Sequence, residues 1–259
     1  MRILYPSDYF ERKKADEHFR SEADAFARAG ADWSTINLDE LGKARPYPDF
    51  AIGETVMYRG WMLNELKYKK LVSAVTSADA GFLIDLDTYL QTHHLPNWYK
   101  LLSDLTPETV VLPLGSDFAS ELDKLGWKSF FVKDFVKSLK TSMGAVITKP
   151  GQIMDLMNEM EKFRGEIEGG LCIRRVEDLV ANSEVRYFVW KGKPFSSVRE
   201  SIPRIVFECA ERITSPFFSV DVAKRSDGAD RVVEIGDGQV SDLVGWPTNR
   251  FVEIFSNEA

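Results

Sequence analysis

Two short runs of β-branched residues near the C-terminus, joined by an Asp-Gly pair, constrain the fold of this chain more than any other feature. The runs cover residues 218–223 and 231–236, and Asp227-Gly228 lies between them. Asp-Gly between alternating apolar residues predicts a two-residue hairpin turn. Counting back from that turn sets the valines and Ile235 on one face of the ribbon and places Asp221 opposite Glu234 on the other.

The opposed carboxylates require an explanation, because like charges that face each other across a sheet are destabilising. A divalent cation would compensate them, since Mg²⁺ takes one or two carboxylate ligands and completes its shell with phosphate and water. The alternative is a solvated hairpin face, with Lys224 and Arg231 nearby. The spacing leaves both interpretations open.

The composition favours an ordinary globular enzyme of the cytoplasm. The chain has 259 residues, 44% hydrophobic and 28% charged, with a net charge of −7. A net negative charge argues against a general nucleic-acid surface. We expect no membrane segment, because no apolar run approaches the length of a span, and no signal peptide. The two cysteines, Cys172 and Cys209, lie in apolar surroundings, as in proteins of a reducing compartment.

The chain divides near Pro107 into two parts with different patterns. Before it, short strands alternate with helices, which predicts an α/β domain over residues 1–106. After it strands dominate, which predicts an α+β domain over residues 107–259 with two lobes, at roughly 107–170 and 171–259. The strands expected in the first domain cover residues 2–5, 33–38, 56–59 and 81–84, and its helices residues 15–29, 62–75 and 98–105.

Lys133 lies in the middle of an apolar strand at residues 130–136. A buried ammonium there would require an anion, and a nucleotide phosphate is one candidate. The alternative is a lysine on the exposed face of an amphipathic strand.

Arginines form a further group on predicted strands. Arg174 and Arg175 are adjacent and point to opposite faces. Arg186 and Arg199 lie on the two strands of a predicted hairpin. Arginine suits bidentate contacts with phosphate or carboxylate, but on a hairpin it is also commonly solvated or paired with a neighbouring acid.

The order of these features resembles the ATP-grasp superfamily over roughly residues 107–244. The stretches that carry the resemblance are Phe131-Val-Lys-Asp-Phe-Val-Lys-Ser138, the pair Arg174-Arg175, Phe218-Ser-Val-Asp-Val-Ala223 and Val233-Glu-Ile-Gly-Asp-Gly-Gln239. Within the superfamily the sequence is similar to the divergent, R2K-type clade that includes a eukaryotic cell-division-cycle protein acting in translation-initiation assembly. The resemblance implies an α+β ATP-grasp fold, preceded by an α/β pre-ATP-grasp domain.

The resemblance also implies residue roles, with ATP and Mg²⁺ as cofactors. Lys133, Arg174 and Arg175 would bind the nucleotide, and Glu177 or Asp178 the ribose. Arg186 and Arg199 would face the phosphates as catalytic groups. Asp221 and Glu234 would hold the metal; Gly236 stands where the family has asparagine, which leaves Asp237 as a possible third ligand.

The implied activity is an ADP-forming carboxylate–amine ligase that works through an acyl-phosphate. Its substrates would be small-molecule, peptide or protein carboxylates and amines. The alternative is a nucleotide-binding assembly factor or protein modifier without a free small-molecule substrate. The run Arg59-Gly60-Trp61 and the pair His93-His94 are further candidates for the substrate side. The oligomeric state does not follow from the sequence.

Overall fold

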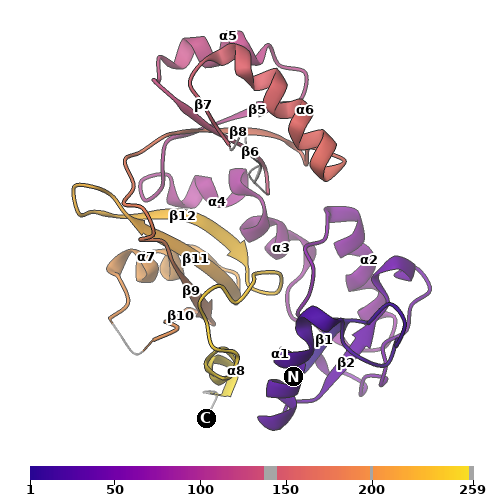
Figure 1. Ribbon diagram of the computed structural model, residues 1–259. Helices are drawn as coiled ribbons and strands as arrows, with labels where there is room; N and C mark the ends of the chain where they lie inside the picture. Colours follow the sequence, from indigo (N-terminus) through magenta and orange to yellow (C-terminus); the bar gives the residue numbers. More distant parts are fainter. Residues whose placement is uncertain (137–144, 199–200, 257–259) are drawn as a thin grey trace. The chain divides into compact units, whose positions relative to one another are not determined.

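The computed structural model describes residues 1–136, 145–198 and 201–256, and the chain forms two compact units. Unit 1 combines Met1–Gln91, Arg186–Val220 and Gly236–Ala259; unit 2 combines Thr92–Val185 and Asp221–Ile235. Figure 1 shows the elements in chain order. The domain boundary predicted after residue 106 falls within the sequence of unit 2, and it stays a prediction.

The N-terminal part of unit 1 is a parallel sheet with strand order β2-β1-β3-β4, as the strand–helix alternation predicts. Ile3 pairs with Trp33 on one side and with Met57 on the other. The strands are β1 (Arg2–Pro6), β2 (Trp33–Ile36), β3 (Thr55–Tyr58) and β4 (Gly81–Phe82), with α1 (Arg20–Arg28), α2 (Glu65–Thr76) and α3 (Leu86–His93) and the 3₁₀ turns η1 (Glu17–Phe19) and η2 (Leu38–Glu40) between or after them.

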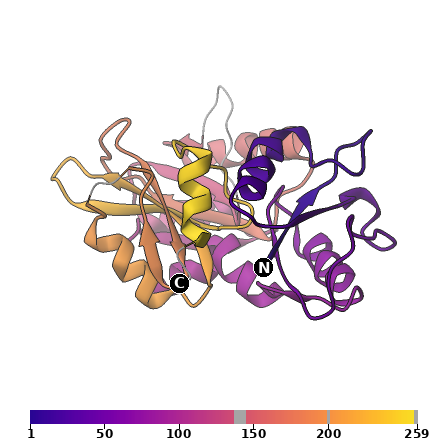
Figure 2. The same ribbon diagram turned by 90° about the horizontal axis from the view of Figure 1, so that it is seen from below.

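Aromatic side chains hold the C-terminal helix of unit 1 against its first helix. The helix α8 (Thr248–Ser256) lies beside α1 (Figure 2), and Phe26 of α1 contacts Phe251 and Phe255. Phe251 in turn packs edge-on against Phe188, so the end of the chain joins the same hydrophobic core as its beginning. This core explains why residues far apart in sequence form one unit.

Unit 2 is built on an antiparallel sheet with strand order β5-β8-β6-β7. Its helices α5 and α6 cover one face of that sheet (Figure 1), and their buried side chains share one core with Phe130, Val132 and Ile173. The elements are α4 (Leu95–Leu102), β5 (Thr109–Pro113), α5 (Phe118–Leu125), β6 (Phe130–Asp134), β7 (Val146–Ile147), η3 (Pro150–Gln152), α6 (Ile153–Arg164) and β8 (Gly170–Arg175).

A third sheet has strand order β10-β9-β11-β12 and includes the predicted C-terminal ribbon. Its strands are β9 (Val185–Trp190), β10 (Lys193–Phe195), β11 (Phe217–Lys224) and β12 (Asp230–Asp237). The helix α7 (Arg204–Arg212) lies between β10 and β11 in the chain, where the sequence analysis assigned no element. Its apolar residues Ile205, Val206 and Cys209 follow helical spacing and are buried, so the signal was present.

No helix in the described ranges has the length and apolar character needed to cross a membrane. Cys172 and Cys209 are both buried, and neither forms a disulfide within the described residues.

Candidate functional site

The alternation of β6 and β8 divides their side chains between two faces of the unit 2 sheet. Val132 pairs with Ile173, and both point into the core under the helices. Lys133 pairs with Cys172 and Phe131 with Arg174, so these four side chains share the opposite face. The candidate site lies on this second face.

Lys133 is buried there, with only 4% of its surface exposed. Its Nζ donates to Oε1 of Glu234 on β12 at 2.7 Å. The interpretation of Lys133 as an exposed strand residue is therefore wrong. The structure brings together two residues that the sequence analysis assigned to one site, from positions a hundred residues apart in the chain.

The two predicted metal ligands differ in their environments. Asp221 on β11 is buried, whereas the side chain of Glu234 is 41% exposed to solvent. Glu234 already has the ammonium of Lys133 as a counter-charge at 2.7 Å.

The ribbon turn is one residue longer than predicted. The N–H of Gly228 donates to the carbonyl of Arg225, and the N–H of Arg225 donates to the carbonyl of Ala229, both at 2.8 Å. The loop therefore contains three residues, with Gly228 at φ +88 in the left-handed region, and the predicted two-residue turn is wrong.

A β-bulge in β12 restores the predicted register at the far end of the ribbon. There the N–H of Gly238 donates to the carbonyl of Phe217 at 3.1 Å. Eight positions separate Phe217 from Arg225 on β11, but nine separate Ala229 from Gly238, so β12 takes up one extra residue. Whether Asp221 directly opposes Glu234 depends on the place of this bulge, and that opposition stays a prediction.

Arg174 is a buried cation whose hydrogen bonds go to neutral groups. Its Nη1 donates to the carbonyl of Val233 at 2.6 Å and its Nη2 to the hydroxyl of Thr106 at 2.5 Å, while the buried Nε has no hydrogen-bond partner in the described part of the chain. Burial lowers the pKa of Arg174 to about 10, opposed only in part by the charge of Glu234. A buried guanidinium with a spare donor marks this face as a place for a further acceptor.

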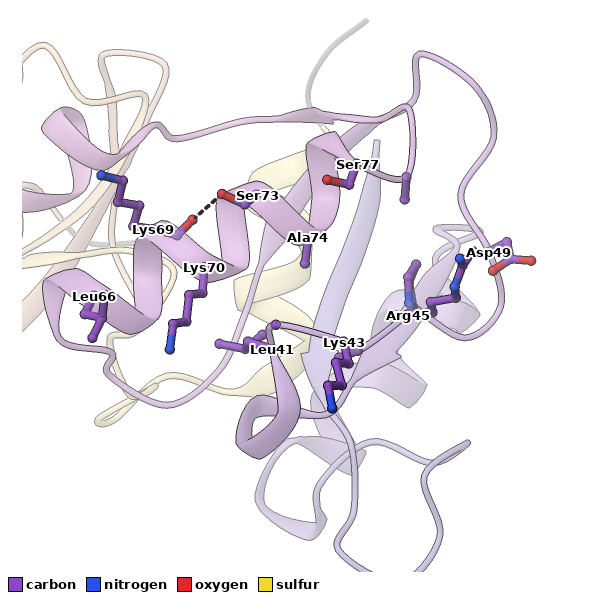
Figure 3. A pocket seen from close by; sticks show the side chains of 14 residues that line it. Leu41, Lys43, Arg45, Asp49, Leu66, Lys69, Lys70, Ser73, Ala74 and Ser77 are labelled. Atoms are coloured by element: carbon purple, nitrogen blue, oxygen red, sulfur yellow. Dashed lines mark hydrogen bonds between the residues drawn. The ribbon is translucent and has the colours of Figure 1, made fainter.

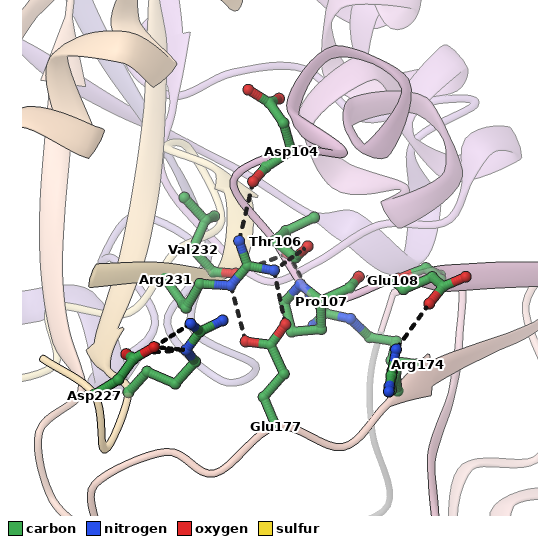
Figure 4. A network of polar contacts seen from close by, with 12 residues as sticks. Asp104, Thr106, Pro107, Glu108, Arg174, Glu177, Asp227, Arg231 and Val232 are labelled. Carbon is green, nitrogen blue, oxygen red and sulfur yellow. Dashed lines mark hydrogen bonds and ion pairs between the residues drawn. The ribbon is translucent and has the colours of Figure 1, made fainter. Parts of the chain in front are cut away.

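Glu177, which follows β8, is committed to a partner from β12. Arg231 binds its carboxylate with two hydrogen bonds of 2.8 and 2.7 Å (Figure 4). Arg231 also donates to the carbonyls of Asp104 and Thr106, so one side chain ties three segments of unit 2 together. The sequence analysis assigned no role to Arg231.

An apolar slot of about 110 Å³ opens between these segments. Phe131 of β6, Val233 of β12 and Val176 beyond β8 form its walls, and Arg174 and Arg231 reach its edge. A larger pocket of about 530 Å³ shares Val176, Glu177 and Arg231 with the slot and extends to Asp178. The apolar walls were not singled out from the sequence, because alternation alone does not tell a slot from a core.

The other predicted site residues have different surroundings. Nη1 of Arg186 donates to the carbonyl of Asp242 at 2.9 Å. Asp237 is fully buried, and its Oδ1 accepts from the backbone N–H and the side-chain amide of Gln239. Arg199 lies outside the described residues. Arg175 is exposed and lies 3.5 Å from Glu108.

Within the described residues, no group of three or more acidic, histidine or cysteine side chains is arranged to hold a metal ion. Among the described residues, the two carboxylates of Asp221 and Glu234 are therefore the first candidates for metal ligands. That number fits Mg²⁺, which usually keeps several waters and takes phosphate oxygens as ligands.

Arg59, a candidate for the substrate side, is instead a buried structural residue. Two of its nitrogens bind the carboxylate of Glu22 at 2.8 and 2.7 Å, and a third donates to the carbonyls of Gly238 and Ser241. The pair His93-His94 ends α3 and precedes α4, and His94 lies 3.0 Å from Glu168. Neither candidate lines the slot.

Comparison with protein families gives a match over more than half of the chain. Residues 103–254 match the model described as the ATP-grasp domain of R2K clade family 3. No curated protein matches the chain.

Solved structures similar to this one include two synthetases and a macrocyclase. D-cycloserine synthetase DcsG is 11% identical with a TM-score of 0.63, covering 99% of both chains. D-alanyl-alanine synthetase A from Vibrio cholerae is 12% identical with a TM-score of 0.61, covering 98% of this chain and 95% of its own. Macrocyclase MdnC bound with precursor peptide MdnA from Microcystis aeruginosa is 14% identical with a TM-score of 0.57, covering 100% of both. At these identities the likeness concerns the fold.

Proposed function

The chain belongs to family 3 of the R2K clade of ATP-grasp domains, and from that membership we propose that it is an ADP-forming, Mg²⁺-dependent carboxylate–amine ligase. In this reaction ATP phosphorylates a carboxylate, an amine attacks the acyl-phosphate, and an amide, ADP and phosphate leave. The observation that carries the proposal is the ion pair between the buried Lys133 and the partly exposed Glu234. It holds in one place an ammonium suited to phosphate and a carboxylate suited to a divalent cation.

The residues of the slot suit a nucleotide base. Phe131, Val176 and Val233 offer apolar walls, and the unpartnered Nε of Arg174 offers a hydrogen-bond donor close by. Small-molecule sites commonly combine such walls with a few placed polar groups. Arg175, at the rim of the slot, would contact the base or phosphates from its exposed side.

Asp178 is the better of the two candidates for the ribose. The carboxylate of Glu177 already accepts two hydrogen bonds from Arg231. The exposed Asp178 lies at the larger pocket, and its carboxylate has no hydrogen bond or ion pair with any residue of the described ranges. A free acceptor at this place suits hydroxyl groups.

Asp221 and Glu234 would hold Mg²⁺, which when bound would neutralise phosphate charge. Gly236 has no side chain that could supply the third metal ligand of the family, and an asparagine would not fit at this position without rearrangement of its neighbours. A Cβ at this position would lie 2.8 Å from the hydroxyl of Ser241 and 2.9 Å from that of Ser219. The hydroxyls of both serines occupy the space where an asparagine side chain would begin. Phosphate and water would therefore complete the coordination shell of Mg²⁺.

The remaining predicted residues keep their proposed roles. Arg186 and Arg199 would neutralise charge on the transferred phosphoryl group, as arginines do in phosphoryl transfer. Asp237 remains a candidate third ligand, although its Oδ1 is committed to Gln239. The substrates would be small molecules or peptides that carry the carboxylate and the amine.

The test combines binding with turnover. Calorimetry on the full chain should show ATP binding that requires Mg²⁺, and pools of amino acids and peptides should stimulate release of ADP and phosphate. We expect Asp221→Asn to abolish turnover, and the matched control Asp123→Asn, an exposed change on α5, to leave it unchanged.

Two results would contradict the proposal. Absence of ATP binding at millimolar nucleotide would remove the nucleotide site itself. Mg²⁺-dependent binding without any release of ADP would favour the alternative of an assembly factor that binds nucleotide without turnover.

A further inference from the structure

A second pocket, of about 570 Å³, lies in unit 1 and shares no residue with the nucleotide slot. One wall is a face of α2 and the other is the segment at residues 41–49 (Figure 3). The residues of α2 on this wall recur three or four positions apart, as the face of one helix requires. Leu41 and Pro46 are buried and give the pocket an apolar floor.

The charge of this pocket is opposite to that of the protein. Lys43, Arg45, Lys69 and Lys70 line it together with a single carboxylate, Asp49, in a chain of net charge −7. Within residues 1–136, 145–198 and 201–256 none of these four cations forms an ion pair or a side-chain hydrogen bond. Clustered like charges repel each other, so an acidic ligand would be favoured here.

The segment that carries two of the cations is fixed in place. Thr35 and Tyr47 exchange backbone hydrogen bonds of 2.8 and 2.9 Å, and the N–H groups of Lys43 and Ala44 both donate to the carbonyl of Glu40. The pocket wall therefore exists before any ligand binds, which lowers the entropic cost of binding.

The shape of the hollow favours an extended ligand over a compact one. A neighbouring pocket of about 360 Å³ shares Leu41, Lys43 and Lys70 with the first, so the two continue along α2 as one groove. It adds Lys67 together with Asp39 and Glu40, and Glu40 already pairs with Arg12. Figure 3 shows Lys70 and Lys43 extending from its two walls. A single phosphate needs converging donors, whereas these cations are exposed and distributed along the groove.

We propose that this groove, called here the α2 groove, binds an acidic segment of a peptide or protein. The carboxylates of the segment would pair with Lys43, Lys67 and Lys70, and its aliphatic parts would cover Leu41. The binding does not depend on the proposed ligase activity, because the slot and the carboxylate pair lie in the other unit.

Fluorescence anisotropy with a labelled hexaglutamate peptide tests the proposal on the full chain without nucleotide. We expect saturable binding that weakens with salt, and no binding of hexalysine. The double variant Lys43→Gln/Lys70→Gln should weaken binding by about fivefold, in keeping with the modest strength of exposed ion pairs. The control Lys100→Gln/Lys128→Gln removes the same charge from exposed lysines of unit 2 and should bind as the parent does.

Three results would overturn the proposal. The first is no hexaglutamate binding at low salt. The second is equal weakening in the two double variants, which would indicate attraction to the protein as a whole. The third is competition by tripolyphosphate at concentrations far below those needed for hexaglutamate, which would identify a phosphate site instead.

Discussion

Among the residues whose burial is described, unit 1 and unit 2 each bury one arginine, and the two arginines are held in opposite ways. Arg59 in unit 1 is 1% exposed and has a carboxylate partner, Glu22, that binds it through two nitrogens. Arg174 in unit 2 is 5% exposed and donates to a carbonyl and a hydroxyl, with Nε left over. Burial alone would lower both pKa values; Glu22 reverses the effect and raises the pKa of Arg59, whereas that of Arg174 falls to about 10.

The difference distinguishes a structural charge from one reserved for a ligand. In a buried ion pair with complete hydrogen bonds, each charge is neutralised by its partner. Removal of one partner leaves the other charge buried and unpaired. A buried cation without an anion is costly until an anion arrives, which is the condition of many binding sites. Arg59 therefore belongs to the framework of unit 1, and Arg174 to the proposed nucleotide site.

The largest expected effect is on folding, through Arg59. We predict that Arg59→Met lowers the free energy of unfolding by about 3–5 kcal/mol, because Glu22 is left buried and unpaired. Urea unfolding measures the loss. The double variant Glu22→Met/Arg59→Met should recover much of it, and a double variant as unstable as the single one would show that the pair is not self-contained.

The next effect is on nucleotide binding, through Lys133. We predict that Lys133→Ala weakens ATP binding by about 1.5–3 kcal/mol, the range for a hydrogen bond to a charged group. Calorimetry measures it, with Lys128→Ala, at an exposed lysine, as control. Unchanged ATP affinity in Lys133→Ala would show that the lysine does not bind nucleotide and serves only to pair with Glu234.

Lys133→Ala also bears on the apo protein, because Glu234 is its partner. Glu234→Gln removes the other partner of the pair and leaves the buried ammonium of Lys133 without a carboxylate. We therefore expect Glu234→Gln to destabilise the apo protein.

Arg174 should show the reverse of the pattern at Arg59. We predict that Arg174→Met changes the free energy of unfolding by about 1 kcal/mol or less, because two lost hydrogen bonds are offset by relief of an unpaired buried charge. ATP affinity should nevertheless fall. A loss of stability as large as that of Arg59→Met would refute the contrast between the two arginines.

The smallest effect concerns the thiol beside Arg174. Burial raises the pKa of Cys172 to about 12, so its thiolate forms only as the pH approaches that value. In a Cys209→Ser background we predict no labelling by Ellman's reagent at pH 8 in the native protein, and full labelling in guanidinium. Rapid labelling of the Arg174→Met variant in the native state would assign a structural role to Arg174.

Sequence reasoning identified the fold because its signals are local or ordered along the chain, whereas the site residues stay predictions. The ATP-grasp fold and its α+β character are confirmed. The ribbon of β11 and β12 follows from its β-branched runs, but the longer turn and the bulge depend on packing that a two-residue signal does not contain. The spacing of Ile205, Val206 and Cys209 indicates the buried face of the helix α7, which the sequence analysis missed.

Burial and pairing could not be read from the sequence. Lys133 on an amphipathic strand fits either an exposed or an enclosed face, and only Glu234 from a distant strand decides between them. Arg59 resembled a substrate contact until Glu22 was found beside it. From the sequence, Glu177 and Asp178 were equal candidates for the ribose. In the structure the carboxylate of Glu177 accepts hydrogen bonds from Arg231, which favours Asp178.

The sequence by itself therefore determined which elements form, in what order, and which chemical groups they carry, because periodicity and turn residues act over short distances. The tertiary structure alone decided which charges meet. An ion pair requires atoms within a few ångströms, and that proximity arises from packing between segments a hundred residues apart, as at Lys133 and Glu234. The same packing left the buried Nε of Arg174 without a hydrogen-bond partner among the described residues, which further supports the proposed nucleotide site in unit 2.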